Sequence, residues 1–317
     1  MLNNAPARSS ARSNAPHIPL DKRPLLGFDL ETTGIDTNTA RVVTAHLSLH
    51  LPGPAGQAPP PEHTHDFLIN PGVEIPTGAS DIHGITTEMA VNHGSAPTDP
   101  ARGLPRIFEL INYYCLPAMH NNYSPALLVG FNLAYDLSLL EAERVRHLSA
   151  APHPSSADYT PPTPPLRFPI GPASEGHPPE DPTIAVVDGY VLDKFLSPFR
   201  KGSRKLTALA RVYGVPLTAE DAHNAAADAI ASTAIVRKQL RALEQTPHLT
   251  VSALKALGYA PGGHRAAPRL GPTTLHMLQA GWHTTQARSL ANYFRRTPGK
   301  SDQKVELGWP IKTGEYA

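Results

Sequence analysis

The sequence predicts an α/β fold in which an antiparallel group of strands is followed by a strand–helix unit. Three stretches with apolar or alternating residues, 25–28, 39–50 and 65–70, are typical of successive strands joined by turns. Residues 126–147 pass from an apolar strand straight into a helical pattern, which is the βα step of a parallel sheet. The apolar run 184–188 predicts the last strand.

Helical patterns between and after these strands predict a layer of helices on the sheet. Residues 101–119 carry apolar side chains at helical spacing, so we expect this helix to cover the sheet. Further helices are predicted over 206–213 and from about 224 to 244, the last with Ile230 and Ile235 toward a core.

The first strand is followed by two acids. Asp29 and Glu31 stand at alternating positions, so both carboxylates point to one face while Leu30 points into the core. Carboxylates this close repel each other unless a cation lies between them. Taken alone, the pair is more often a polar turn after a strand. Two later segments favour a metal site instead.

These two segments each place an acid at the start of a helix. Asp136 lies in the first turn of the helix after the strand 126–131, and Asp228 lies near the start of an alanine-rich helix. His223 precedes Asp228 by five residues, which would place the two side chains roughly 140° apart in a regular helix. We therefore expect His223 at or before the helix N-terminus, where it can point at the same site.

In this order, the three segments resemble the three exonuclease motifs of the DnaQ-like, or DEDDh, family of 3′-to-5′ exonucleases, over roughly Pro24 to Gln245. The resemblance implies a ribonuclease H-like fold: a mixed five-stranded sheet, with strands 1–3 antiparallel and strands 4–5 parallel, flanked by helices. Beyond the region of resemblance, the residues themselves predict a C-terminal helical extension. The resemblance also implies four carboxylates that are both catalytic and metal-binding, namely Asp29, Glu31, Asp136 and Asp228.

The chemistry implied by the resemblance is hydrolysis of a phosphodiester with two Mg²⁺ or Mn²⁺ ions about 4 Å apart. All-oxygen ligation favours these ions over zinc. Asp29 would bridge the ions, Glu31 and Asp228 would bind the ion that activates water, and Asp136 would hold the second ion through water. His223 would take the proton of the attacking water, a task suited to an imidazole.

Contacts with the terminal nucleotide also follow from the resemblance, which includes a His-Gly-Ile-Thr loop. An aromatic side chain next to Asp136 can stack on a base. The ordinary alternatives are an exposed loop histidine at His83 and a core tyrosine at Tyr135. The predicted nucleotide contacts are Thr32, Thr33, Gly34, His83, Asn132 and Tyr135.

The predicted function is therefore a metal-dependent 3′-5′ exonuclease that releases nucleoside 5′-monophosphates from single-stranded DNA ends, of the proofreading or repair type. Its expected partners are nucleic acid 3′ ends, DNA more than RNA, and a DNA polymerase or another replication or repair protein is a candidate partner. Two alternatives stay open: an exoribonuclease that trims RNA 3′ ends, and a nucleic-acid binding module without turnover. The oligomeric state is left open.

Charge is spread unevenly along the chain and supports a three-part organisation. The net charge is +1, but residues 1–23 carry four Arg or Lys against one acid, and residues 246–317 carry nine against three. We expect a disordered N-terminal tail (1–23), an acidic exonuclease domain (24–245) and a basic helical extension (246–317), with a helix over 273–296. The extension can dock on the domain, clamp nucleic acid or bind a protein.

Two segments of the exonuclease domain are read without help from the motifs. The stretch 150–182 holds eleven prolines in 33 residues and predicts an extended or disordered insertion. The run 199–206 carries four cations that either hold a phosphodiester backbone or form a solvated surface. Asp188 and Asp193 are rival acids, but the family pattern has no ligand there, so we expect them to act at the strand end and on the following helix.

Cysteine content and hydropathy exclude several classes. Cys115 is the single cysteine, which leaves no disulfide framework and no cysteine-based zinc site. Because no apolar stretch approaches the length of a membrane span, we expect no membrane partner. A reducing cytoplasm is the expected location.

Overall fold

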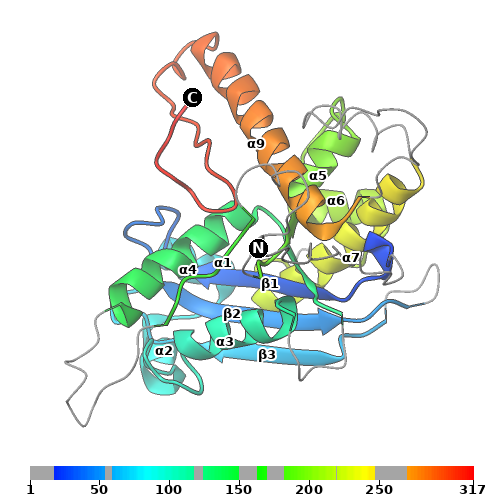
Figure 1. Ribbon diagram of the computed structural model, residues 1–317. Helices are drawn as coiled ribbons and strands as arrows, with labels where there is room; N and C mark the ends of the chain where they lie inside the picture. Colours follow the sequence, from blue (N-terminus) through cyan, green and yellow to red (C-terminus); the bar gives the residue numbers. More distant parts are fainter. Residues whose placement is uncertain are drawn as a thin grey trace, which may run out of the picture.

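The computed structural model describes residues 18–53, 59–117, 124–149, 163–169, 182–218, 220–246 and 270–317. In these residues a five-stranded sheet has the order β3-β2-β1-β4-β5 (Figure 1). Strands β1 to β3 are antiparallel, and β4 and β5 run parallel to β1. This is the predicted ribonuclease H-like sheet. The strands are β1 (Leu25–Thr32), β2 (Val42–His50), β3 (His63–Leu68), β4 (Leu127–Gly130) and β5 (Val186–Asp188).

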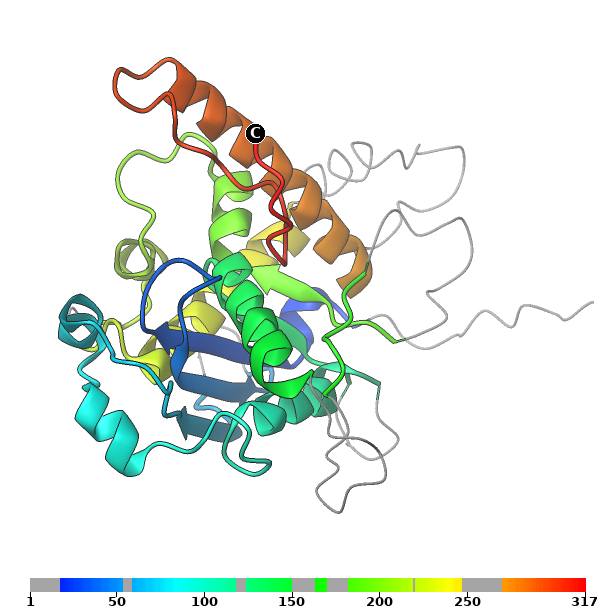
Figure 2. The same ribbon diagram turned by 90° about the vertical axis from the view of Figure 1, so that its left-hand side faces the viewer.

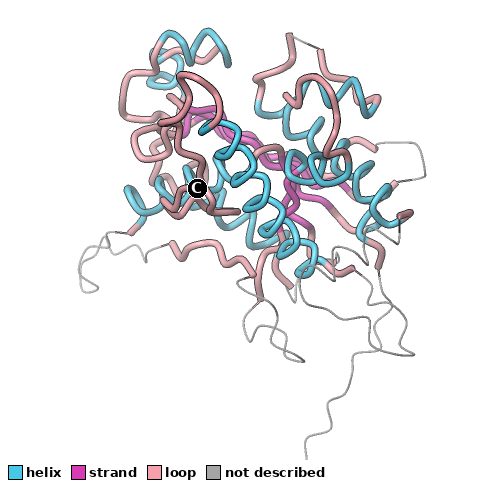
Figure 3. Tube along the Cα trace, turned by 90° about the horizontal axis from the view of Figure 1, so that it is seen from above, coloured by secondary structure: helices cyan, strands magenta, loops and turns pink. Residues whose placement is uncertain are grey.

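Helices lie on both sides of the sheet (Figure 3). They are α1 (Thr77–His83), α2 (Thr87–His93), α3 (Leu104–Cys115), α4 (Leu133–Leu148), α5 (Gly189–Leu196), α6 (Leu206–Tyr213), α7 (Ala225–Glu244) and α9 (Pro272–Arg295), with a short 3-10 turn at Leu20–Lys22. The predicted helices 101–119, 206–213, 224–244 and 273–296 are confirmed with small shifts of their ends. Ile235 is buried as expected, but Ile230 is 37% exposed, so its predicted core position is wrong.

Strand β1 is longer than predicted. It continues through Asp29 and Glu31 to Thr32, and these two acids pair with His46 and Thr44 of β2. The backbone bonds with β2 therefore override the preference of these polar residues for a turn. The register becomes irregular only between Glu31 and Thr32.

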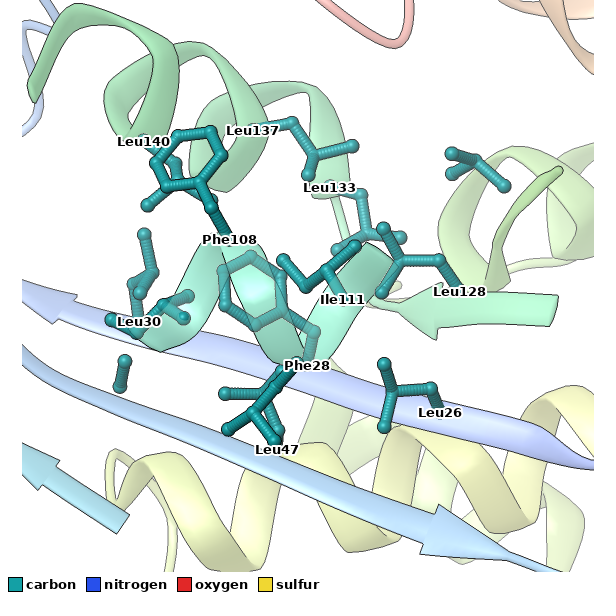
Figure 4. Close-up of a cluster of buried hydrophobic side chains, with 14 of the residues drawn as sticks. Leu26, Phe28, Leu30, Leu47, Phe108, Ile111, Leu128, Leu133, Leu137 and Leu140 are labelled. Carbon is teal, nitrogen blue, oxygen red and sulfur yellow. The ribbon is translucent and has the colours of Figure 1, made fainter. Parts of the chain in front are cut away.

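One face of β1 packs into the larger hydrophobic core. Phe28 and Leu30 are buried there against Phe108 of α3 and Leu137 of α4 (Figure 4). Burial of side chains of this size contributes roughly 1.5–3 kcal/mol each. Because side chains alternate along a strand, burying Phe28 and Leu30 turns Asp29 to the opposite face.

The opposite face of β1 is covered by α7, which approaches the strand closely at Gly27. A Cβ atom at Gly27 would lie 2.4 Å from the Oγ1 of Thr233 and 3.1 Å from the carbonyl oxygen of Ala229. Only glycine admits the helix at this distance. Asp228, which precedes Ala229, is thereby brought to the face of β1 that carries Asp29.

The C-terminal helix α9 closes the open edge of β5. The amide side chain of Gln279 accepts a bond from the N–H of Asp188 (2.9 Å) and donates one to the carbonyl of Val186 (3.0 Å). His276 Nδ1 accepts from the N–H of Val186 (3.1 Å). Both side chains are fully buried, so they satisfy backbone groups that a neighbouring strand would otherwise pair.

The described part of the extension, residues 270–317, thus packs on the domain. This is the first of the three predicted alternatives for the extension. After α9 the chain returns to α4 (Figures 1 and 2). Other boundaries also shift. Leu20, within the predicted tail 1–23, is fully buried. In the predicted insertion, residues 163–169 have no regular secondary structure, and Leu166 and Phe168 pack against the core.

The remaining predictions for the tail, the insertion and the extension concern residues 1–17, 150–162, 170–181 and 247–269, which lie outside the described residues. Among the described helices, none combines the length and the apolarity needed to cross a bilayer.

Replacing Gln279 by Ala should destabilise the fold by about 2–4 kcal/mol, because two buried backbone groups of β5 lose their partners. Gln286→Ala on the same helix is the matched control: its side chain is half-buried and makes one bond, to the carbonyl of Val191 (3.1 Å). We expect the control to cost about 1 kcal/mol or less. Urea unfolding measures both, and equal losses would contradict the edge-closing role of α9.

Candidate active site

One cleft of about 660 Å³ gathers the five residues predicted to carry the chemistry. Its lining includes Asp29 and Glu31 from β1, Asp136 from the first turn of α4, and His223 and Asp228 from the start of α7. The strand order reverses at β1, so the carboxyl ends of β1 and β4 meet at a switch point. Open α/β sheets bind their ligands at such points.

Three of the four carboxylates form a tight group. Oxygen atoms of Asp29, Glu31 and Asp228 all lie within 4.8 Å of one another. The first two share a face because they are two residues apart on a strand, and α7 supplies the third. Asp136 lines the same cleft outside this group. The acids are therefore arranged as a group of three with a separate fourth.

Burial and mutual repulsion make these acids hard to ionise. Burial raises the pKa of Asp29 well above its ordinary value, and the charges of Asp136, Asp228 and Glu31 add to the shift. Burial, then the charges of Asp228 and Asp136, raises the pKa of Glu31 to about 8. The pKa of Asp136 is raised to about 8, chiefly by burial. The pKa of Asp228 is raised, again mainly by burial. A divalent cation would reverse these shifts.

An unsatisfied carboxylate oxygen of Asp228 is a second feature of the cleft that suits a metal ion. Oδ2 of Asp228 accepts a bond from the backbone N–H of His223 (3.2 Å), but among the described residues nothing bonds to the buried Oδ1. A buried carboxylate oxygen without a donor is costly unless a cation binds it. The all-oxygen donor set suits Mg²⁺ or Mn²⁺.

His223 stands in the turn before α7, as predicted. Its backbone has a φ of 69°, and its side chain is exposed in the cleft. Asn224 caps the helix by accepting bonds from the N–H groups of Ala226 (3.0 Å) and Ala227 (3.3 Å). The cap starts the helix directly after His223, which leaves the imidazole outside the helix and on the same side as Asp228.

Tyr135 ties the turn after β1 to α4. Its hydroxyl lies 2.8 Å from the Oγ1 of Thr32 and donates to the carbonyl of Gly34. Tyr135 and Asn132 line the cleft. Thr32 and Gly34 are not among the lining residues, but both are bonded to the hydroxyl of Tyr135, which is. The side chain of Tyr135 is half-buried, so it is both a structural tie and part of the cleft wall.

The other two predicted nucleotide contacts lie outside the cleft. Thr33 is buried, and both its hydroxyl and its amide bond to the backbone of Arg41, so this residue fixes the turn and its predicted nucleotide contact finds no support. His83 is the last residue of α1 rather than part of a loop. Burial lowers the pKa of its imidazole, and the backbone of Thr32 partly offsets this, which places the ring beside the exit of β1.

The rival acids serve the fold, as expected. Asp188 is buried at the end of β5 and accepts bonds from the N–H groups of Asn132, Leu133 and Tyr190, at 2.9–3.0 Å. It thus joins the starts of α4 and α5 to the sheet. Asn132 itself has a φ of 63°, the left-handed conformation that turns the chain from β4 into α4.

The basic run 199–206 is only partly free for a ligand. Fully buried Asp193 binds Arg200 (2.8 Å) and Arg204 and accepts a bond from the hydroxyl of Tyr213 (2.8 Å). Two of the four cations therefore hold α5, α6 and the loop between them. Lys205 lines the cleft next to Arg204 and keeps the predicted phosphate-binding interpretation open.

Several cleft residues were missed by sequence reasoning. Phe131 and Tyr190 line the cleft with ring centroids 5.7 Å apart, edge to face. Aromatic rings in such a position can stack on bases. Phe131 directly follows β4, in the segment that leads to Asp136, and could have been noted there. Tyr190 follows Asp188, and only the packing of β5 beside β4 brings it to the cleft.

Sheet order and cleft together define a ribonuclease H-like fold with a cluster of acids at its switch point. Solved structures similar to this chain include Escherichia coli exonuclease I in complex with a dT13 oligonucleotide, at 17% identity and a TM-score of 0.47, covering 73% of this chain and 43% of that chain. Another is an exonuclease I from Methylocaldum szegediense, at 16% identity and a TM-score of 0.45, covering 74% of this chain and 45% of that chain.

The zinc-bound form of the E. coli exonuclease I complex with single-stranded DNA is also similar, at 17% identity and a TM-score of 0.47, covering 74% of this chain and 43% of that chain. The present chain spans less than half the length of these solved structures. No family model matches the chain, and no curated protein matches it either. At this level of identity, the function has to be inferred from the cleft itself.

The metal-free protein should lose stability between pH 6.5 and 8. Unfolded Asp and Glu titrate near pH 4, whereas Glu31 and Asp136 have a pKa of about 8 in the folded state, so the folded state holds extra protons in this window. Stability therefore falls as the pH rises toward 8. His50 and His276, with pKa values lowered by burial to about 4 and about 3, give the opposite slope only below about pH 6.5.

Thermal unfolding in a chelator at pH 6.5 and pH 8 measures this loss, and Mn²⁺ should restore the stability at pH 8. Glu31→Gln should raise the Tm of the chelated protein at pH 8 by roughly 5 °C. Glu109→Gln, an exposed acid paired with Arg106 on α3, is the matched control and should change little. A Glu31→Gln variant that behaves like this control would disprove the strain in the cluster.

Proposed function

We propose that the chain is a metal-dependent 3′-5′ exonuclease that acts on single-stranded DNA ends and releases nucleoside 5′-monophosphates. The observation that carries the proposal is the convergence of four acids and one exposed imidazole on one open cleft. The four acids have raised pKa values, and none of the described side chains forms an ion pair with them. A structural cluster would be paired with cations, as Asp193 is.

Each acid has a role in holding cations. Asp29, Glu31 and Asp228 would share one Mg²⁺ or Mn²⁺ ion, and Asp29 and Asp136 would share a second. When bound, these ions would neutralise the phosphate and lower the pKa of water. Asp228 directs its free oxygen into this group because its other oxygen is held by the N–H of His223.

His223 would accept the proton of the attacking water. Its imidazole is exposed beside Asp228 and outside the helix, so it can move toward a water molecule in the cleft. The oxygen of that water bonds to phosphorus, and the 3′ oxygen of the preceding nucleotide leaves. The product is a nucleoside 5′-monophosphate and a strand shorter by one nucleotide. A proofreading or repair role, with a DNA polymerase as a candidate partner, follows from the resemblance alone.

Asp29 and His223 should respond differently to truncation. His223→Ala should lower turnover by about 10²–10⁴-fold yet keep the affinity for Mn²⁺, because it removes a proton acceptor and no metal ligand. Asp29→Ala should lose both. Calorimetry with Mn²⁺ and release of mononucleotides measure the two properties, with His93→Ala, an exposed histidine at the end of α2, as the control. Equal metal binding in the His223 and Asp29 variants would contradict these roles.

Single-stranded DNA and RNA oligonucleotides of matched sequence test the substrate. With Mn²⁺ or Mg²⁺ we expect mononucleotides to appear from the 3′ end of DNA first, and faster than from RNA. A 3′-terminal label should be released before an internal label. Faster digestion of RNA would favour the trimming alternative. Binding of 3′ ends without release of any mononucleotide would favour a non-catalytic module.

A further inference from the structure

The chain's last described segment reaches the edge of the cleft and places a cation there. Lys312 lies 174 residues after Ser138, yet its backbone N–H donates to the hydroxyl of Ser138 on α4 at 2.7 Å. Its ammonium lies 5.2 Å from the ring centroid of Tyr135, which forms part of the cleft wall. Figures 1 and 2 show this segment (red) returning from α9 to α4.

The segment that carries Lys312 is anchored rather than loosely laid on the surface. Trp309 is 9% exposed, and its ring packs against His276 with centroids 4.8 Å apart. The chain then folds back on itself, with Leu307 donating to the carbonyl of Glu315 at 2.8 Å. The carboxylate of Glu306 accepts from the N–H groups of Gly308 and Thr313 within this turn. Lys312 is therefore held in a defined position.

A second groove, of about 460 Å³, lies on the far side of this contact. Its lining includes Lys312, Ser138, and Thr37 and Asn38 from the turn after β1. The other charged side chains in its lining are Arg146, Glu141 and Glu306.

Those other charges have partners. Arg146 is paired with buried Glu143, Glu141 is paired with Arg144, and Glu306 accepts backbone amides. Lys312 contacts the face of an aromatic ring instead, which leaves its ammonium able to bind an anion as well. Among the charged residues described in the lining of this groove, Lys312 is thus the cation available to bind an anion next to the acidic cleft.

Lys312 lies close to acidic residues on both sides of Tyr135. On one side, its ammonium lies over the ring of Tyr135, the residue directly before Asp136. The pKa of Asp36 is lowered chiefly by the N–H of Asn38, with a small contribution from Lys312. The ammonium is therefore close to the metal-binding acid and close to the turn that borders the second groove.

Resting on the proposed exonuclease function, we propose that Lys312 is a positioning residue that binds a backbone phosphate of the substrate strand, upstream of the scissile bond. The scissile phosphate belongs with the acid cluster and its cations. A strand whose last nucleotide lies in the cleft continues past Tyr135 into the second groove, where its next phosphates meet Lys312. The C-terminal segment is then part of the substrate site and not an appendage.

Lys312→Gln should raise the KM for a single-stranded oligonucleotide about tenfold and change kcat by less than about twofold, because it removes a contact made equally in the ground and transition states. The 4-nitrophenyl ester of thymidine 5′-monophosphate has no upstream phosphate, so its hydrolysis should not change. Lys312→Arg should restore the KM. Lys300→Gln is the matched control, since Lys300 also lies over a ring (Phe294, 5.8 Å) in the same C-terminal segment.

Binding provides a readout that does not need turnover. In a His223→Ala background, loss of one phosphate contact should reduce the slope of log Kobs against log salt by about 0.7. Equal loss on the oligonucleotide and the nitrophenyl ester would show that Lys312 acts through Asp136 or the fold, and would overturn the proposal. So would a Lys312→Gln variant that matches Lys300→Gln. If the wild-type chain hydrolyses neither substrate, the proposed function fails, while the salt slope still decides the role of Lys312.

Discussion

The close packing of α7 on β1 at Gly27 is the contact on which the site depends. A side chain at this position would strike Thr233 and the backbone of Ala229, and the helix would have to move away from the strand. Asp228 stands directly before Ala229, so that movement would carry its carboxylate away from Asp29 and Glu31. The absence of one Cβ atom therefore sets the distance between two parts of the chain that are some 200 residues apart in sequence.

Buried acids in this protein fall into two kinds, and the difference is in their partners. Asp188 receives three backbone N–H groups, and Asp193 binds two arginines and a tyrosine hydroxyl. Both are satisfied within the fold. The acids of the cleft face one another instead, and burial together with the charges of the neighbouring carboxylates raises the pKa values of Asp29 and Glu31. An acid that the fold leaves unsatisfied is a better functional candidate than one that is merely buried.

The C-terminal segment completes the domain in two ways. Gln279 and His276 of α9 take the place of a sixth strand at the edge of β5, which keeps that edge from water and from other strands. The segment that then returns to α4 packs on α9. A segment that sequence alone describes as a basic extension is thus part of the sheet's environment, and its position next to Tyr135 follows from that attachment.

Sequence by itself predicted the directions of the five strands, through the resemblance, and the four acids and the histidine that the structure gathers in one cleft, because each depends on local patterns and on the order of three motifs. Periodicity put Asp29 and Glu31 on one face of a strand, and helical geometry put His223 before α7. Tertiary structure decided what depends on contacts between distant residues. It showed that Asp193 takes up two of the four cations in the basic run, and that Thr33 is buried in a turn. It also brought Tyr190 into the cleft and Lys312 over the ring of Tyr135 at its edge, which no local pattern could indicate because their neighbours there come from other parts of the chain.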